Sequence, residues 1–188
     1  MLTCPACAKP TAYVSYQQNY QHDMFKGETF MAFPRLAAKP PAPPEVPELI
    51  AQDFNEAAAV LSISAQASAA LSRRCLQHVL SQRSVSTSSN LSIAIDAALA
   101  SGLPSQLAEN LDAIRNIGNF AAHAQKAEHS GEVVPVEPEE AEWNLEVLEL
   151  LFDFYYVQPS VAAARRSALN AKLAEVGKSP MKEPPGVA

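Results

Sequence analysis

The feature that most constrains the fold is a long stretch, residues 47–176, in which apolar side chains recur at helical spacing. Prolines, glycines and short polar runs interrupt this pattern at intervals and mark off separate helices. Strand-like patterns are too few for a sheet-based domain. We therefore expect an all-α bundle of about five or six helices.

Start and stop signals place the ends of these helices. Pro47 and Glu48 suit a first turn, Asn90 or a nearby serine can cap a helix, and Gly102 can end one. Pro138 is followed by two glutamates, which favour a helix N-terminus. The expected ranges are about 48–61, about 64–82, about 91 to the stop at Gly102, 104 to about 123, 138 to the break at Pro159, and about 160–176.

Residues 1–46 form a separate compositional zone, an N-terminal arm that ends in a proline-rich run. Such proline density excludes helix and sheet interiors and favours polyproline II. We interpret the run as a semi-rigid strap or linker, and a ligand for a proline-reading domain is the alternative. The helical domain then spans residues 47–176, and residues 177–188 are expected to be a mobile tail. The prolines concerned are Pro40, Pro41, Pro43, Pro44 and Pro47.

Charge and composition exclude several classes of protein. The net charge of −6 argues against a generic nucleic-acid coat, although a local basic cleft is compatible with it. Three cysteines are too few for a disulfide framework and suit a reducing compartment. No apolar run is long enough to span a membrane, and the first residues do not resemble a signal peptide. We expect a cytoplasmic protein with no membrane contact.

Four hydrogen-bonding residues line one face of the helix expected over 104–123. Asp112, Arg115, Asn119 and His123 lie within about 80° of one another on a helical wheel. As a site, His123 would be the acid/base, Arg115 would hold a phosphate, and Asn119 would orient either group. As structure, Arg115 would bridge to Asp112 or Asp96, and His123 would cap the helix.

Three segments together resemble a bacterial family, domain of unknown function family 4145. They are SISAQASAALSRRCLQHVL, LDAIRNIGNFAAHA and VEPEEAEWNLEVLELLFDFYYVQP, and the resemblance covers about residues 47–160, which is most of the chain. That family is similar to the HEPN superfamily of helical bundles. The resemblance implies a HEPN-like bundle that is either a ribonuclease acting as a dimer or a catalytically silent interaction module.

The resemblance also implies site residues. The nuclease motif of the HEPN superfamily is an arginine, often followed by a polar residue, with a histidine about four to six residues further on. Arg115, Asn116 and His123 match these roles, but seven residues separate Arg115 from His123. In a regular helix that spacing puts their Cα atoms about 12 Å apart. A dimer, or a helix break near Gly118, would be needed to bring the two side chains to one phosphate.

Cys4 and Cys7 form a C-P-x-C turn, which is the usual first half of a zinc ribbon. No second pair follows, and relatives in the family implied above often carry the full ribbon. The turn therefore resembles a degenerate remnant, with free thiols or a zinc site, including one shared across a dimer, as the two alternatives. No other cofactor is expected.

Other polar residues are expected to have structural roles. Either Arg73 or Arg74 would face the Arg115–His123 stripe or pair with an acidic residue of the core. Cys75 is predicted to be core, and His78 is predicted to be a half-buried packing residue. An acidic stripe on the fifth helix is expected to be a solvated face, or alternatively to receive a basic partner. Its members are Glu142, Glu146, Glu149 and Asp153.

Two functions follow from the sequence. The first is a non-catalytic interaction module in bacterial defence or stress response, with a protein partner or a second copy of the chain. The alternative is a metal-independent ribonuclease that uses Arg115 and His123 on an RNA substrate. A ribonuclease needs these two residues to converge in an open, positive cleft.

Overall fold

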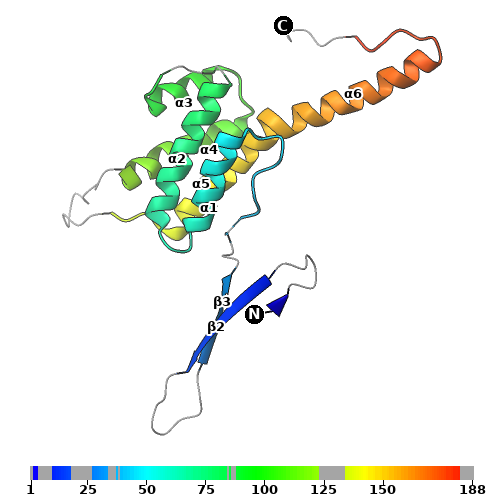
Figure 1. Cartoon of the computed structure of the whole chain (residues 1–188). Helices are drawn as coiled ribbons and strands as arrows, with labels where there is room; N and C mark the ends of the chain where they lie inside the picture. The colour runs from blue at the N-terminus through cyan, green and yellow to red at the C-terminus, as the bar shows by residue number, and fades with distance from the viewer. Residues whose placement is uncertain are drawn as a thin grey trace.

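The computed structural model describes residues 2–3, 10–17, 27–33, 37, 39–83, 85, 88–122 and 134–182 (Figure 1). Most of these residues are helical, which confirms the predicted all-α bundle. Six α-helices and one π-helical turn are seen in the described part of the chain, within the predicted range. They are α1 (Glu48–Val60), α2 (Ala65–Gln82), α3 (Leu91–Ala100), α4 (Ser105–Ala122), α5 (Pro138–Phe152), η1 (Asp153–Val157) and α6 (Gln158–Glu175).

Local capping chemistry explains several of these boundaries. Asn90 caps α3 as expected, because its side-chain oxygen accepts from the Ser92 amide at 2.9 Å. Ser64 caps α2 in the same way through the Ala67 amide. The loop after α3 turns at Gly102, whose φ of 83° lies in the left-handed region that favours glycine.

The core lies between α1, α2, α4 and α5, and α2 contacts all three of the others as well as α3. Phe54 of α1 meets Phe152 of α5 edge to face, with ring centroids 5.2 Å apart. Large aliphatic side chains fill the rest of this core. The most deeply buried include Ile50, Leu76, Leu80, Ile95, Leu111, Ile114, Leu145, Leu148 and Leu151.

The expected break at Pro159 is not observed. The chain passes from α5 through η1 into α6 with helical backbone angles throughout. The amide of Gln158 donates to the carbonyl of Asp153, five residues back, so the π turn inserts one extra residue. A proline lacks the amide that an α-helix would use, and the wider turn next to Pro159 accommodates it without ending the helix.

The N-terminal arm contains strands that the sequence did not lead us to expect. β1 (Leu2–Thr3), β2 (Pro10–Gln17) and β3 (Gly27–Phe33) form an antiparallel sheet in the order β1-β2-β3. Aromatic and β-branched residues in β2 favour this conformation. None of the strands packs against a helix in the described part of the chain, and β2 and β3 lie apart from the bundle in Figure 1.

The proline-rich run lies along the helical bundle. Val46 is buried in the core, and the Ala42 amide donates to the Asn55 side chain of α1 at 2.9 Å. These contacts agree with the strap interpretation. At the other end of the chain, the Met181 amide donates to Asn170, and Arg166 donates to the Lys182 carbonyl, so residues 181–182 lie against α6.

None of the helices in the described residues is both long enough and apolar enough to cross a membrane.

Candidate functional site

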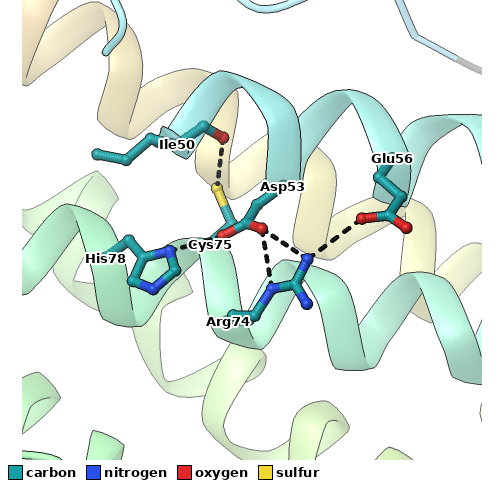
Figure 2. Close-up of polar contacts among 6 residues, drawn as sticks. All are labelled: Ile50, Asp53, Glu56, Arg74, Cys75 and His78. Carbon is teal, nitrogen blue, oxygen red and sulfur yellow. Dashed lines mark hydrogen bonds and ion pairs between the residues drawn. The ribbon is translucent and has the colours of Figure 1, made fainter. Parts of the chain in front are cut away.

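The most concentrated group of charged side chains joins α1 to α2 around the carboxylate of Asp53. We call Asp53, Glu56, Arg74 and His78 the Asp53 cluster (Figure 2). The Asp53 side chain is 5% exposed, and both of its oxygens are used. Oδ1 accepts a hydrogen bond from Arg74 Nε at 2.8 Å and forms an ion pair with Nη2 at 2.7 Å, while Oδ2 lies 2.7 Å from His78 Nδ1.

Arg74 and His78 differ in how completely their nitrogens are engaged within the cluster. Arg74 is also paired with Glu56 at 3.2 Å, so two carboxylates share its positive charge. His78 uses one ring nitrogen for Asp53, and Figure 2 shows its other ring nitrogen pointing away from that carboxylate. The His78 side chain is 34% exposed, compared with 51% for Arg74 and 60% for Glu56.

A small hollow of about 190 Å³ lies beside His78. This volume is below the range of most small-molecule sites, and its lining is mostly apolar. It can admit a small group but does not enclose a cofactor. The lining residues are Pro47, Leu49, Ile50, His78, Ser81 and Gln82.

Cys75 lies directly under the cluster but is not a reactive thiol. It is fully buried, which confirms the prediction that it is core, and its Sγ donates to the Ile50 carbonyl at 3.5 Å. Burial raises the pKa of the thiol well above its ordinary value, and the nearby Asp53 carboxylate raises it further. The nucleophilic thiolate is therefore disfavoured at neutral pH.

Arg115, the predicted phosphate anchor, is held by two carboxylates. Its guanidinium pairs with Asp96 at 3.2 Å and with Asp112, and it also donates to the Ser92 hydroxyl at 3.3 Å. The structural alternative in the sequence had Arg115 bridging to one of these two aspartates, and the structure has it pairing with both. A phosphate would have to displace them, so this arginine is neutralised within its own chain.

The remaining predicted site residues are described only in part. The α4 backbone is helical through Gly118 and Asn119, so no helix break shortens the spacing after Arg115. The side chain of Asn119 lies outside the described residues, as do His123, Cys4 and Cys7. Across the part of the chain that the structure describes, no group of three potential metal ligands comes together.

Sequence reasoning missed the role of Asp53 and placed His78 only as packing. Arg74 was expected to face a stripe or to pair with an acidic core residue, and it does the latter. One available signal was spacing, because Arg73 and Arg74 precede His78 by five and four residues. This spacing is the one that the resemblance to the HEPN superfamily implies for a nuclease arginine and histidine, whereas the spacing from Arg115 to His123 is longer.

The acidic stripe of α5 receives a cation from the same chain. Lys39 Nζ, just before the proline-rich strap, lies 3.4 Å from Glu142, 3.2 Å from Glu146 and 3.9 Å from Glu149. Burial by itself would lower the pKa of Lys39, but its contacts with these carboxylates raise it overall. Burial also raises the pKa of Glu149. The stripe is thus paired, in part, with a lysine of its own chain.

Comparison with known proteins gives one match. Searches of curated proteins and of solved structures each found nothing that matches this chain. A family model described as Domain of unknown function (DUF4145) matches residues 55–175, which include the end of α1 and everything from α2 to the last residue of α6. Because this match covers more than half of the chain, the protein belongs to the DUF4145 family.

Proposed function

We propose that this protein is a non-catalytic interaction module whose binding element is α6. The observation that carries the proposal is that α6 buries none of its residues, although it is an 18-residue helix. Most helices in proteins are stabilised by packing an apolar face, and among the described residues α6 extends from η1 without packing against another α-helix. A partner for α6 would supply that packing.

The exposed surface of α6 has the composition of a docking helix. Leu169, Leu173 and Val176 lie within about 60° of one another on the helical wheel. Leu169 is 45% exposed and Val176 is 67% exposed. Basic side chains flank this apolar stripe, which favours a partner surface that is apolar and acidic. These flanking residues are Arg165, Arg166 and Lys172.

The ion pairs of Arg115 and Arg74 favour a non-catalytic module over a nuclease. Arg115 and Arg74 are each bound by two carboxylates, so neither offers uncompensated charge to a phosphate. The HEPN-like superfamily, the setting in bacterial defence or stress response and the cytoplasmic location rest on the sequence, and we include them in this proposal.

Ribonuclease activity centred on His78 is the second candidate, favoured by the Asp53–His78 contact. A buried carboxylate that holds one imidazole nitrogen leaves the other directed outward, as a general acid/base requires. The hollow beside His78 would receive part of the substrate. RNA would be the substrate class, in line with the arginine–histidine spacing.

Site-specific photocrosslinking in producing cells tests the interaction module. A photoreactive residue at Leu169 or Val176 should give a crosslinked product of discrete mass. The same residue at Ile93, which is 55% exposed on α3, is the matched control and should give none. Absence of any product from both α6 positions would refute the proposal.

RNA cleavage in EDTA tests the second candidate. The interaction module predicts no cleavage by the purified protein. Cleavage that disappears in His78→Ala and persists in Arg115→Ala would establish the second candidate in its place.

A further inference from the structure

We propose that the partner of α6 is a second copy of this chain, docked antiparallel along the rod formed by α5, η1 and α6. This inference rests on the proposed function and names its partner. The rod is one continuous helical element from Pro138 to Glu175 in Figure 1. At about 1.5 Å per residue it extends for roughly 55 Å, long enough for an extended helix–helix contact.

Charge is separated along the rod. Residues 138–157 carry six carboxylates and no basic residue. Residues 158–178 carry four basic residues and one carboxylate. The acidic half includes Glu139, Glu142, Glu146, Glu149 and Asp153, and the basic half includes Arg165, Arg166, Lys172 and Lys178. Parallel pairing of two rods would oppose like charges, whereas antiparallel pairing opposes unlike charges at both ends.

Exposed apolar side chains occur on both halves. Trp143 is 44% exposed and Leu150 is 48% exposed on α5, and Phe154 in η1 is 38% exposed. Trp143 and Leu150 are seven residues apart, as are Leu169 and Val176 on α6. A seven-residue spacing keeps side chains on nearly the same face of a helix, so each half carries an apolar stripe.

The π turn aligns the two stripes. In an uninterrupted α-helix, Leu169 would lie about 80° around the axis from Trp143. The extra residue in η1 turns α6 back by about 100°, which places Leu169 within about 20° of Trp143. The two stripes therefore form one seam along the rod, and this gives the π turn a structural purpose.

Antiparallel register follows from the midpoint of the rod, between Tyr156 and Val157. A two-fold axis there puts Trp143 of one copy opposite Leu169 and Asn170 of the other. The same axis places Glu146 near Arg166, and Glu142 near Lys172. Because one rod carries both members of every pair, an identical chain is the partner that satisfies both ends.

The acidic half already binds an ammonium group. Lys39 lies within 4.0 Å of three of its carboxylates, which shows that the geometry accepts a cation. One lysine does not balance six carboxylates, so the acidic half keeps net negative charge for a basic helix. The side chains of Glu142, Glu146 and Glu149 remain 39–55% exposed.

Sedimentation velocity of the full chain tests the assembly. Wild type should sediment with twice the chain mass of 20.2 kDa at micromolar concentration. Leu169→Asp should weaken the dimer by about tenfold or more, because it places a carboxylate in the apolar seam. Ile93→Asp, on the exposed face of α3, is the matched control and should leave the dimer unchanged.

A charge swap tests the orientation. In the antiparallel register, Arg165→Glu with Arg166→Glu places two carboxylates beside Glu146 and Glu149 of the other copy. Glu146→Lys with Glu149→Lys instead places two ammonium groups beside Arg165 and Arg166 of the other copy. Each doubly substituted chain should be monomeric alone, and an equimolar mixture should form a heterodimer. Circular dichroism confirms that each variant is folded.

A monomeric wild type, or a mixture that fails to associate, would overturn the antiparallel dimer. The photocrosslinking separates this failure from failure of the proposed function. A discrete crosslinked product from Leu169 whose mass differs from that of the dimer would support the interaction module and refute the proposal that its partner is a second copy of the chain.

Discussion

Replacing Asp53 with alanine tests whether the Asp53 cluster holds α1 against α2. The Asp53 carboxylate is buried and accepts hydrogen bonds on both oxygens, from Arg74 at 2.7–2.8 Å and from His78 at 2.7 Å. These contacts bridge residues 21 and 25 positions apart in the sequence. Removing the carboxylate therefore removes a link between two helices and leaves Arg74 and His78 without this acceptor.

The size of the effect follows from the exposure of the partners. A hydrogen bond to a charged group contributes about 1.5–3 kcal/mol to stability. The side chains of Arg74 and His78 are 51% and 34% exposed, so water replaces part of what each loses. Taking the lower end for each partner, Asp53→Ala should lower the free energy of unfolding by about 3 kcal/mol. For a domain of this size, the Tm should fall by roughly 10 °C.

Urea unfolding followed by circular dichroism at neutral pH measures this loss. The matched control is Glu56→Gln, which removes the other carboxylate on Arg74. Glu56 is 60% exposed, so its pair should contribute less than about 0.5 kcal/mol. Asp53→Asn keeps the shape and one acceptor and should fall between the two. A loss for Asp53→Ala no larger than that for Glu56→Gln would refute the reasoning.

Two further substitutions and one labelling experiment have defined outcomes. Asn144→Leu should raise stability by about 1–2 kcal/mol in urea unfolding, because its amide is fully buried and has no hydrogen-bond partner among the described residues; a loss would reveal a partner. Burial raises the pKa of Tyr156 to about 12. The stability that its protonated hydroxyl gives the folded state is therefore complete below pH 10 and is lost as the pH rises toward 12. Tyr156→Phe should reduce the fall in Tm between pH 10 and pH 12. It should also lower the free energy of unfolding by about 1 kcal/mol at neutral pH, since the hydroxyl donates to Gln82 at 2.6 Å. An unchanged fall in Tm at alkaline pH would contradict this. With the other two cysteines replaced by serine, Cys75 should react with a thiol reagent only at the rate of unfolding, and fast labelling of the native protein would contradict its burial.

Local signals were sufficient to predict most of the helical domain. α1 begins at the predicted residue and ends one residue early, and Asn90 caps α3 as expected. These features depend on side chains within one helical turn of one another, so they can be recognised in the sequence. Pro159 was misjudged because a π turn depends on how the neighbouring helix packs, and proline alone does not reveal it.

The candidate site was harder to predict for the same reason. Arg115 lies on a polar helix face, and the sequence left open whether that face is a site or a structural tie. The contacts with Asp96 and Asp112 decide its partners. Asp53 carried no signal of its own, since nothing in its neighbourhood indicates that Arg74 and His78 of another helix lie within hydrogen-bond distance.

The sequence by itself determined the helical character and the family, and it predicted the proline-rich strap. It also contained the charge separation along residues 138–178. Only the tertiary structure decided which charges are already paired, that α6 buries none of its residues, and that α5 and α6 form one rod. The physical reason is the sequence separation of the residues on which each feature depends. Helix formation depends on residues three or four positions apart, whereas burial and ion pairing depend on elements that meet only after the chain has packed.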